Sequence, residues 1–292
     1  MRRVIDLSEH NGEVDFDKVK ADGINDVLLR IGWIGNKNNH TIDTKFNNYY
    51  NEAKRNGLNV GVYVFSYCLS VETLLSGVEW VKNLLTNKTL ELPVFLDLED
   101  DEESSTKISP CGKENLTQQA LAFCRSIENY GFKAGVYASK DWFNRLIDVY
   151  QLEKYKIWLA EWYVNEPTVS YKVDLWQYTN KEKVYGVYEP DYGCDCSKCF
   201  CEIEGSEPQI IIDNGESEDF EDMKKYINGT TEEPIFADTN LTVKIGTLFP
   251  HGECECLGVF NNRAMLRYPI YSGSNIINYK IGFAKWLGGI QN

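Results

Sequence analysis

Residues 93–99 read Pro-Val-Phe-Leu-Asp-Leu-Glu, an apolar run of strand-forming residues that ends in two carboxylates, Asp97 and Glu99. Side chains alternate between the two faces of a strand, so the two acids share one face and lie roughly 7 Å apart. Their charges repel each other, and a partly desolvated site raises one pKa while the other stays low. A proton donor and an anion then coexist at the same pH. Such a pair is suited to cleaving a glycosidic bond, and the alternative interpretation is an acidic loop edge.

The same Asp-x-Glu spacing occurs three more times in this acidic chain, without an apolar run before it. We interpret these pairs as solvated loop charge: Asp100 with Glu102, Asp101 with Glu103, and Asp219 with Glu221. Only residues 93–99 combine the spacing with the pattern of a buried strand.

Segments typical of strands and of helices alternate from the N-terminus onward. Strands are expected at 4–7, 27–31, 60–65, 93–99, 134–138, 157–162 and 173–178, with a less regular one near 184–195, and helices at 46–55, 71–85 and from 115 to a stop at Gly131. About eight strands alternating with helices predict an α/β fold, a β/α barrel of the TIM type. In such barrels chemistry gathers at the C-terminal ends of strands. The residues expected there are Asp6, Arg30, Tyr67, Asp97, Glu99, Tyr137, Trp162, Gln177 and Asp195.

The composition of the 292 residues excludes two classes of partner. A net charge of −14 argues against nucleic acid, because binding phosphates requires clustered Lys and Arg. No run approaches the ~18 apolar residues of a membrane span. The N-terminus enters a strand without an apolar targeting region. We therefore expect a protein made in a bacterial cytoplasm, in which disulfides are not expected from the nine cysteines.

Several short motifs recur in the order of one known family. They are Asp6-Leu7-Ser8-Glu9-His10-Asn11-Gly12 with Asp15-Phe16, Gly61-Val62-Tyr63, Leu96-Asp97-Leu98-Glu99, Gly135-Val136-Tyr137, Ile157-Trp158-Leu159-Ala160 and Leu175-Trp176-Gln177-Tyr178. Over roughly residues 1–200 the chain resembles the family 25 glycoside hydrolases, the lysozymes of phages and of bacterial autolysins. The resemblance implies an irregular β/α barrel, with Glu99 as acid/base, Asp97 as its electrostatic partner, and Asp6 and Asp195 completing an acidic floor. Asp191 is a rival for the last role.

The resemblance implies hydrolysis of the β-1,4 bond between N-acetylmuramic acid and N-acetylglucosamine in peptidoglycan. Because Asp97 and Glu99 project from one strand, they are poorly placed as an inverting pair, and we expect retention through attack by the substrate's own 2-acetamido group. The expected setting is a phage endolysin that acts on the wall after release. The alternatives are a bacterial autolysin, a glycosidase for another N-acetylated polymer such as chitin, and a non-catalytic wall-binding protein.

Four aromatic residues and one amide are candidates for binding sugar: Tyr63, Tyr137, Trp162, Trp176 and Gln177. An aromatic residue in a strand is also a normal core residue, so both interpretations stay open for each. Trp162 stands where the family usually has Tyr, a change that can reshape a sugar subsite without touching the acids.

Four cysteines fall within eight residues, at positions 194, 196, 199 and 201. They can hold zinc, pair in an oxidising medium or remain free thiols, and Cys254 and Cys256 are further candidate ligands. The family offers no precedent for a metal here, so we assign neither a metal nor a cofactor.

The charge distribution divides the chain into three parts. Residues 1–212 form the catalytic barrel, 213–234 an acidic connector with a helical turn near 220–227, and 235–292 a small module of four or five short strands. The module resembles a bacterial SH3-like barrel, and lysozymes of this type usually carry a wall-binding module. We expect it to bind the cell wall or a wall polymer, with a structural appendage as the alternative. About 58 residues bury only a small core, which favours self-association.

Overall fold

The computed structural model describes residues 2–36, 39–188, 193–200, 224–227, 232–236, 244–248, 253–260, 263–272 and 275–285. The chain forms two compact units, Met1–Ile210 and Ile211–Asn292, which we describe separately.

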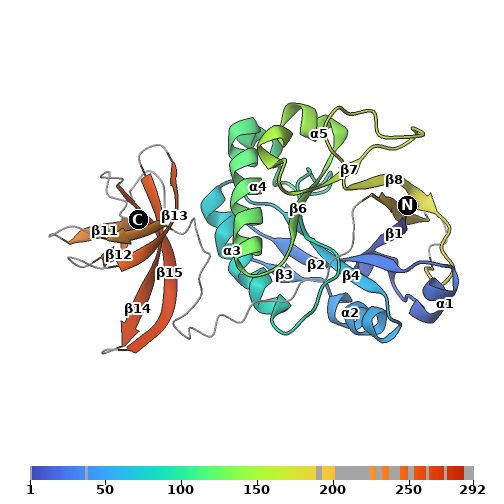
Figure 1. The fold of residues 1–292 in the computed structure, drawn as a ribbon, viewed down its shortest axis with the longest axis horizontal. Coiled ribbons are helices and arrows are strands. Elements are labelled where there is room, and N and C mark those ends of the chain that lie inside the picture. Colours follow the sequence, from blue (N-terminus) through green and yellow to red (C-terminus); the bar gives the residue numbers. More distant parts are fainter. Residues whose placement is uncertain are drawn as a thin grey trace. The chain divides into compact units, whose positions relative to one another are not determined.

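The first unit is built on one nine-stranded sheet that closes on itself (Figure 1). Its strands are β1 (Arg2–Leu7), β2 (Asp26–Ile34), β3 (Thr41–Ile42), β4 (Asn59–Ser66), β5 (Val94–Asp97), β6 (Ala134–Ser139), β7 (Lys156–Ala160), β8 (Leu175–Glu182) and β9 (Cys194–Cys199). Because β1 pairs with both β2 and β9, eight strands form a barrel, and β3 pairs only with β2. The predicted α/β barrel is therefore confirmed.

Helices follow the first strands but not the last ones. They are α1 (Phe16–Ala21), α2 (Phe46–Arg55), α3 (Val71–Leu85), α4 (Gly112–Asn129) and α5 (Lys140–Arg145), with short 3-10 turns η1 (Glu9–Asn11), η2 (Ser109–Cys111) and η3 (Val149–Leu152). The barrel strands run parallel except for β9, which is antiparallel to both β1 and β8. The last strand was expected near 184–195 and instead begins at Cys194.

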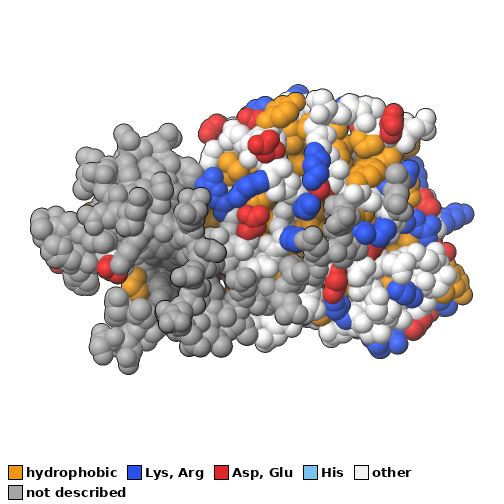
Figure 2. All heavy atoms as spheres, viewed as in Figure 1, with side chains coloured by type: hydrophobic (Ala, Val, Ile, Leu, Met, Phe, Trp, Pro, Cys, Tyr) orange, Lys and Arg blue, Asp and Glu red, His pale blue; other side chains and the backbone are white. Residues whose placement is uncertain are grey.

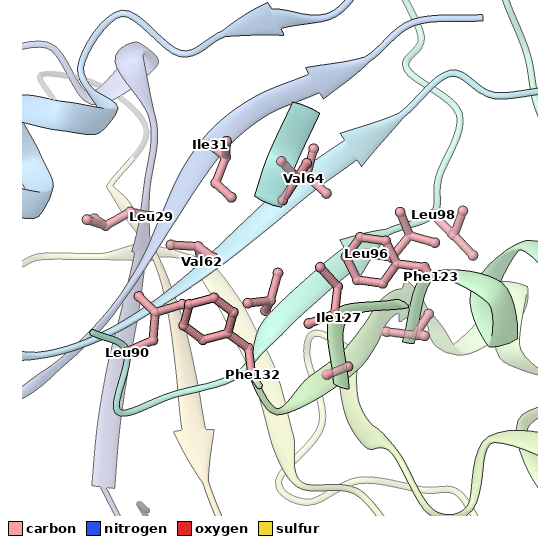
Figure 3. Packing of buried hydrophobic residues seen from close by; sticks show 14 of the residues in the cluster. Leu29, Ile31, Val62, Val64, Leu90, Leu96, Leu98, Phe123, Ile127 and Phe132 are labelled. Carbon is pink, nitrogen blue, oxygen red and sulfur yellow. The ribbon is translucent and has the colours of Figure 1, made fainter. Parts of the chain in front are cut away.

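Strand β5 shows why this sequence forms a barrel strand. All four of its residues are buried, as expected for a parallel strand covered on both faces. Val94 and Leu96 pack outward with helix residues such as Phe123 of α4, and Figure 3 shows Leu96 and Phe123 in this cluster. Phe95 instead points into the barrel, where its ring centroid lies 5.3 Å from that of Trp158. The strand ends at Asp97, so the acids emerge at its C-terminal end.

The helices follow the capping and periodicity signals of the sequence. Ser70 caps α3 by accepting a hydrogen bond from the amide of Thr73. The predicted face of α4 is buried, and the helix is followed by Gly131, whose φ of 97° suits glycine. The helix residues buried on that face are Leu116, Ala120, Phe123, Cys124 and Ile127. No helix in the described residues is long and apolar enough to span a membrane.

The second unit is a six-stranded antiparallel sheet in the order β10-β13-β14-β15-β11-β12. Its strands are β10 (Lys224–Ile227), β11 (Glu233–Phe236), β12 (Lys244–Leu248), β13 (Glu253–Phe260), β14 (Arg263–Ser272) and β15 (Asn275–Lys285). Six of its described side chains form a small buried cluster: Ile235, Leu248, Cys254, Leu266, Tyr268 and Ala284.

The expected boundary of the small module needs a correction. Strand β10 and the start of β11 lie in 213–234, the range expected to be a connector, and β10 pairs with β13. The helical turn expected near 220–227 is wrong for residues 224–227, which form a strand, and residues 220–223 lie outside the described residues. Among the described residues the sheet therefore already includes 224–227, before position 235.

Strand alternation also explains the cysteine cluster. Cys194 and Cys196 are buried against the outer core, whereas Cys199 faces the barrel interior, where its Sγ accepts a hydrogen bond from Arg2 at 3.2 Å. Cys194 and Cys196 are free thiols, and the residues that the structure describes contain no group of side chains arranged to hold a metal. Cys201 lies outside the described residues, as does Asp191.

Candidate active site

Four carboxylates meet at one end of the barrel. Asp6 of β1 is paired in register with Asp195 of β9, and Asp97 ends β5, with Glu99 two residues further on. Asp6 and Asp97 are only 7% and 4% exposed. The charges of Glu99 and Asp6 both act on Asp97, and the charge of Asp195 acts on Glu99. The structure thus brings together all four acids predicted from the sequence.

Burial and mutual repulsion keep protons on this cluster. Burial, then the charges of Asp195 and Asp101, raise the pKa of Glu99 to about 7. Burial, then the charge of Glu99, raises the pKa of Asp97. The pKa of Asp6 is raised in the same way by burial and by Asp195. Because neighbouring desolvated carboxyls cannot all ionise, the site holds a transferable proton near neutral pH.

One oxygen of Asp97 has no hydrogen-bond partner. Its Oδ1 is buried and unpaired among the residues that the structure describes. Buried carboxylate oxygens normally accept at least one hydrogen bond, so this atom is suited to accept an N–H or O–H from a bound molecule. The unpaired oxygen lies within the acidic cluster.

Gln177 of β8 joins three of the predicted site residues. Its Nε2 donates to Asp6 Oδ2 at 3.2 Å, and its Oε1 accepts from Tyr137 Oη at 3.0 Å and from Trp162 Nε1 at 3.2 Å. The amide is only 2% exposed. Because Tyr137 and Trp162 can only donate to the oxygen of the amide, its nitrogen must face Asp6. The hydrogen bond from this nitrogen lowers the pKa of Asp6 and so opposes the effect of burial.

The floor of the site is aromatic. The Trp158 ring centroid lies 4.5 Å from that of Tyr137 and 5.8 Å from that of Tyr63, and its Nε1 donates to Ser197 Oγ at 2.9 Å. Burial, then the charge of Asp6, raises the pKa of Tyr63, so its hydroxyl stays protonated beside the acids. Tyr63 and Tyr137 therefore serve both as core and as lining of the site.

The structure corrects one predicted site residue, Trp176. It neighbours Gln177 in β8 and so points to the opposite face of the strand, away from the barrel interior. It is 2% exposed, its Nε1 donates to the carbonyl of Glu161 at 2.8 Å, and Lys198 lies 4.8 Å from its ring centroid. Trp176 is therefore a buried core residue on the outer face of the barrel and is not positioned to stack on a sugar.

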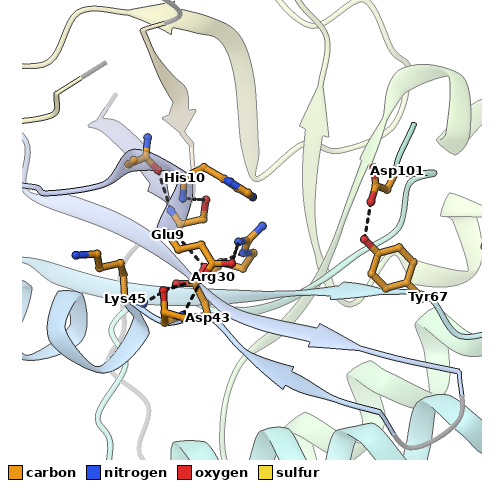
Figure 4. A network of polar contacts seen from close by, with 10 residues as sticks. Glu9, His10, Arg30, Asp43, Lys45, Tyr67 and Asp101 are labelled. Atoms are coloured by element: carbon orange, nitrogen blue, oxygen red, sulfur yellow. Dashed lines mark hydrogen bonds and ion pairs between the residues drawn. The ribbon is translucent and has the colours of Figure 1, made fainter. Parts of the chain in front are cut away.

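An ion-pair network supplies a cation close to the acids (Figure 4). The cation is Arg30, which lies within β2 rather than at its end, since the strand continues to Ile34. Arg30 donates to Asp43 Oδ2 at 2.8 Å and to Glu9 Oε1 at 3.1 Å, and the amide of Glu9 donates to the same Asp43 oxygen at 2.9 Å. The positive charge of Arg30 opposes the raised pKa of Asp97. Sequence reasoning placed Arg30 at a strand end but missed Asp43, because residue 43 belongs to a loop without periodicity.

An open groove of about 510 Å³ lies at the C-terminal ends of the neighbouring strands β2, β4 and β5. Tyr67 donates to Asp101 Oδ2 at 2.7 Å in its wall (Figure 4). The lining residues are Trp33, Gly35, Asn36, Asn39, Tyr67, Asp101, Glu103, Ser104 and Thr106. Asp101 and Glu103 were interpreted from the sequence as solvated loop charge, and both instead line this groove. Asp101 follows Glu99 by two residues in the sequence.

Comparisons with known proteins agree with this geometry. The family model described as glycosyl hydrolases family 25 matches residues 5–187. Among solved structures, the CTP1L endolysin is 24% identical with a TM-score of 0.56, and the alignment covers 68% of this chain and 66% of that one. The autolysin LytC from Streptococcus pneumoniae is 23% identical with a TM-score of 0.56, covering 67% and 46%.

The bacterial lysozyme from Streptomyces coelicolor is 20% identical with a TM-score of 0.56, covering 68% of this chain and 92% of that one. The matched part spans less than two thirds of the endolysin and of the autolysin, and these identities establish the fold alone. No curated protein sequence matches the chain.

Proposed function

Because the chain belongs to glycosyl hydrolase family 25, we propose that this glycoside hydrolase is an N-acetylmuramidase that cleaves the β-1,4 bond between N-acetylmuramic acid and N-acetylglucosamine in peptidoglycan. One observation carries the proposal. A glutamate with a pKa of about 7, Glu99, stands beside an aspartate, Asp97, whose Oδ1 is buried and unpaired among the described residues. The two groups supply a proton and an acceptor in one place.

The first step of the proposed reaction breaks the glycosidic C–O bond. Glu99 gives its proton to the leaving oxygen, and the oxygen of the substrate's 2-acetamido group attacks the anomeric carbon to form a cyclic oxazolinium ion. Asp97 Oδ1 accepts the amide N–H and stabilises the positive charge that develops there. Because the acetamido oxygen of the substrate is the nucleophile, the protein does not have to supply one.

The second step consumes water. The Glu99 carboxylate removes a proton from water, whose oxygen adds to the anomeric carbon as the ring of the intermediate opens, and the glutamic acid is restored. Two displacements at one carbon give net retention. The product should be the β anomer when it first forms, which NMR can observe before mutarotation.

Asp6 and Asp195 have supporting roles in this proposal. Their proximity to Glu99 and Asp97 keeps protons on the cluster, and Gln177 holds Asp6 in place. The groove beyond Asp101 offers amides and aromatic rings of the kind that hold neutral sugars. The intact set of four acids disfavours a wall-binding protein without activity.

We also propose that the setting is host-cell lysis by a phage endolysin, made in the bacterial cytoplasm and acting on the wall after release. The structural likeness to the CTP1L endolysin favours this setting, and the likeness to the autolysin LytC keeps an autolysin as the second candidate. The small all-β sheet is proposed to be an SH3-like module that binds the wall or an associated polymer. Neither nucleic acid nor a membrane is a proposed partner.

The test of the activity uses purified bacterial walls. The chain should clear a wall suspension and generate new reducing ends, and Glu99→Gln should lose on the order of 10²-fold or more because an amide cannot donate the proton. Glu102→Gln is the matched control, since this nearby acid is exposed and has no role in the proposal. Equal clearing by Glu99→Gln and the wild type, at equal stability, would remove Glu99 from the mechanism.

A further inference from the structure

Tyr163 combines exposure with an unusual backbone conformation. Its side chain is 86% exposed, and its φ is 61°, in the left-handed region. Among the described residues only Asn87 shares a positive φ without being glycine. Asn tolerates this region, whereas for a bulky residue it is strained, and such strained residues are found mainly at functional sites. The exposed ring makes no core contact that offsets the strain.

The turn that presents Tyr163 is fixed at its base. The amide of Glu161 donates to the carbonyl of Gln177 at 3.1 Å, and the Glu161 side chain accepts from Lys140 Nζ at 2.7 Å and from the amide of Thr168 at 2.8 Å. Trp176 bonds the carbonyl of the same glutamate. The backbone therefore leaves β7 in a defined direction, and the position of Tyr163 is set by the fold.

This turn is part of the active-site wall. Trp162 donates to Gln177, which in turn donates to Asp6 of the acidic cluster. The Cα atom of Tyr163 lies one peptide unit, about 3.8 Å, beyond that of Trp162. Figure 2 shows hydrophobic side chains, with both basic and acidic ones among them, over the part of the barrel that carries α5, β7 and β8. Tyr163 thus stands at the rim, one residue outside a side chain bonded into the site.

We propose that Tyr163 is a sugar-binding residue whose ring forms a platform for a pyranose of the glycan strand, one or more units away from the bond that is cleaved. The inference rests on the proposed function, since it assumes a polysaccharide in the cleft. A tyrosine ring presents a rigid apolar face, which matches the C–H face of a sugar ring. The fixed, strained turn holds this face ready in the free protein, which lowers the entropy lost on binding.

Two other exposed tyrosines show why exposure alone is not the argument. Tyr150 and Tyr185 are 67% and 59% exposed, but neither has a positive φ. Lys18 Nζ lies over the ring of Tyr185, 5.7 Å from its centroid. Tyr185 therefore serves as the matched control for removing an exposed aromatic ring.

The experiment compares Tyr163→Gly, Tyr163→Phe and Tyr185→Ala, each in a Glu99→Gln background so that the glycan is not consumed. The readouts are the dissociation constant for a peptide-free glycan chain of several disaccharides and the thermal stability. Glycine adopts a φ of 61° without strain, so Tyr163→Gly should be at least as stable as its parent. It should nevertheless bind the glycan about three- to tenfold more weakly, while Tyr163→Phe and Tyr185→Ala bind as the parent does.

A dissociation constant for Tyr163→Gly within a factor of about two of the parent would overturn the inference. So would weaker binding that appears only when the glycan carries stem peptides, because the ring would then contact peptide. A loss of stability with unchanged affinity would assign Tyr163 a structural role instead. Failure of the proposed function is seen separately, as an absence of new reducing ends when the wild-type chain is added to walls.

Discussion

Glu99→Gln should raise the stability of the protein above neutral pH and lower its activity. Burial and neighbouring charges raise the pKa of Glu99 from its ordinary 4.5 to about 7. The folded state therefore disfavours the ionised carboxyl, by roughly 3 kcal/mol as an upper bound. A raised pKa gives stability that is fully present below pH 4.5 and is lost as the pH rises through 7. Glutamine carries no charge and avoids that loss.

The assay is thermal unfolding of both proteins at pH 4.5 and pH 8, followed by circular dichroism. Proton sharing with Asp97 and Asp6 reduces the full effect, so we expect the variant to be more stable at pH 8 by about 1–3 kcal/mol. For a domain of this size that corresponds to a rise in Tm of roughly 3–10 °C. At pH 4.5 the two Tm values should nearly coincide, because Glu99 is then protonated in the folded state and only half ionised in the unfolded state, which changes the free energy of unfolding by about 0.4 kcal/mol.

A Glu99→Gln variant that melts at or below the wild-type temperature at pH 8 would refute this reasoning. The carboxylate would then be stabilised by its surroundings, and Glu99 would not be held as a proton donor. Glu102→Gln provides the control, because its exposed side chain predicts no change in Tm at either pH. Activity measured on the same samples should fall for the first variant and stay unchanged for the second.

The remaining predictions concern the pH profile, the hydrogen bonds of Gln177 and the small sheet. Above pH 7, kcat/KM on a soluble glycan should fall about tenfold per pH unit, because ionised Glu99 cannot donate a proton; a profile flat to pH 9 would contradict the assignment. Gln177→Leu removes the common hydrogen-bond partner of Asp6, Tyr137 and Trp162, and it should lower kcat/KM by about 10- to 100-fold in a folded protein. A loss below about threefold would show that these hydrogen bonds are dispensable for activity. Fluorescently labelled full-length Glu99→Gln should bind host walls. Residues 1–210 with the same substitution should bind them far less, and equal binding would assign wall binding to the barrel.

The catalytic acids were predictable from the sequence because their signal is local. The apolar run of β5 ends directly at Asp97, and the alternation of side chains places Glu99 on the same face. The helices were predictable for a similar reason, since α3 and α4 carry caps and buried faces with helical spacing. The motifs shared with the family added the order of these elements.

Other features depend on contacts between distant residues. Strand β9 is antiparallel, pairs irregularly with β8 and is rich in Cys, so no apolar run marks it. The groove residues Asp101 and Glu103 come from a loop that meets β2 and β4 only in the folded chain. Strand β10 begins with two lysines, which hides it in a polar stretch.

The core position of Trp176 follows from the alternation of side chains along β8. Trp176 and Gln177 are neighbours in one strand, so only one of them can face the barrel interior. The pattern of β8, with Leu175 and Gln177 on the inner face, assigns the outer face to Trp176. Because successive side chains of a strand point to opposite faces, Gln177 faces the site and Trp176 belongs to the outer core.

The most direct test of the proposed activity is the identity of the sugar at the new reducing ends released from purified peptidoglycan. After digestion, the reducing ends are reduced with borohydride, the glycan is hydrolysed, and the resulting sugar alcohol is identified by mass spectrometry. The mechanism proposed for Glu99 and Asp97 predicts the alcohol of muramic acid. The alcohol of glucosamine as the main product would contradict cleavage on the reducing side of N-acetylmuramic acid and with it the assigned bond.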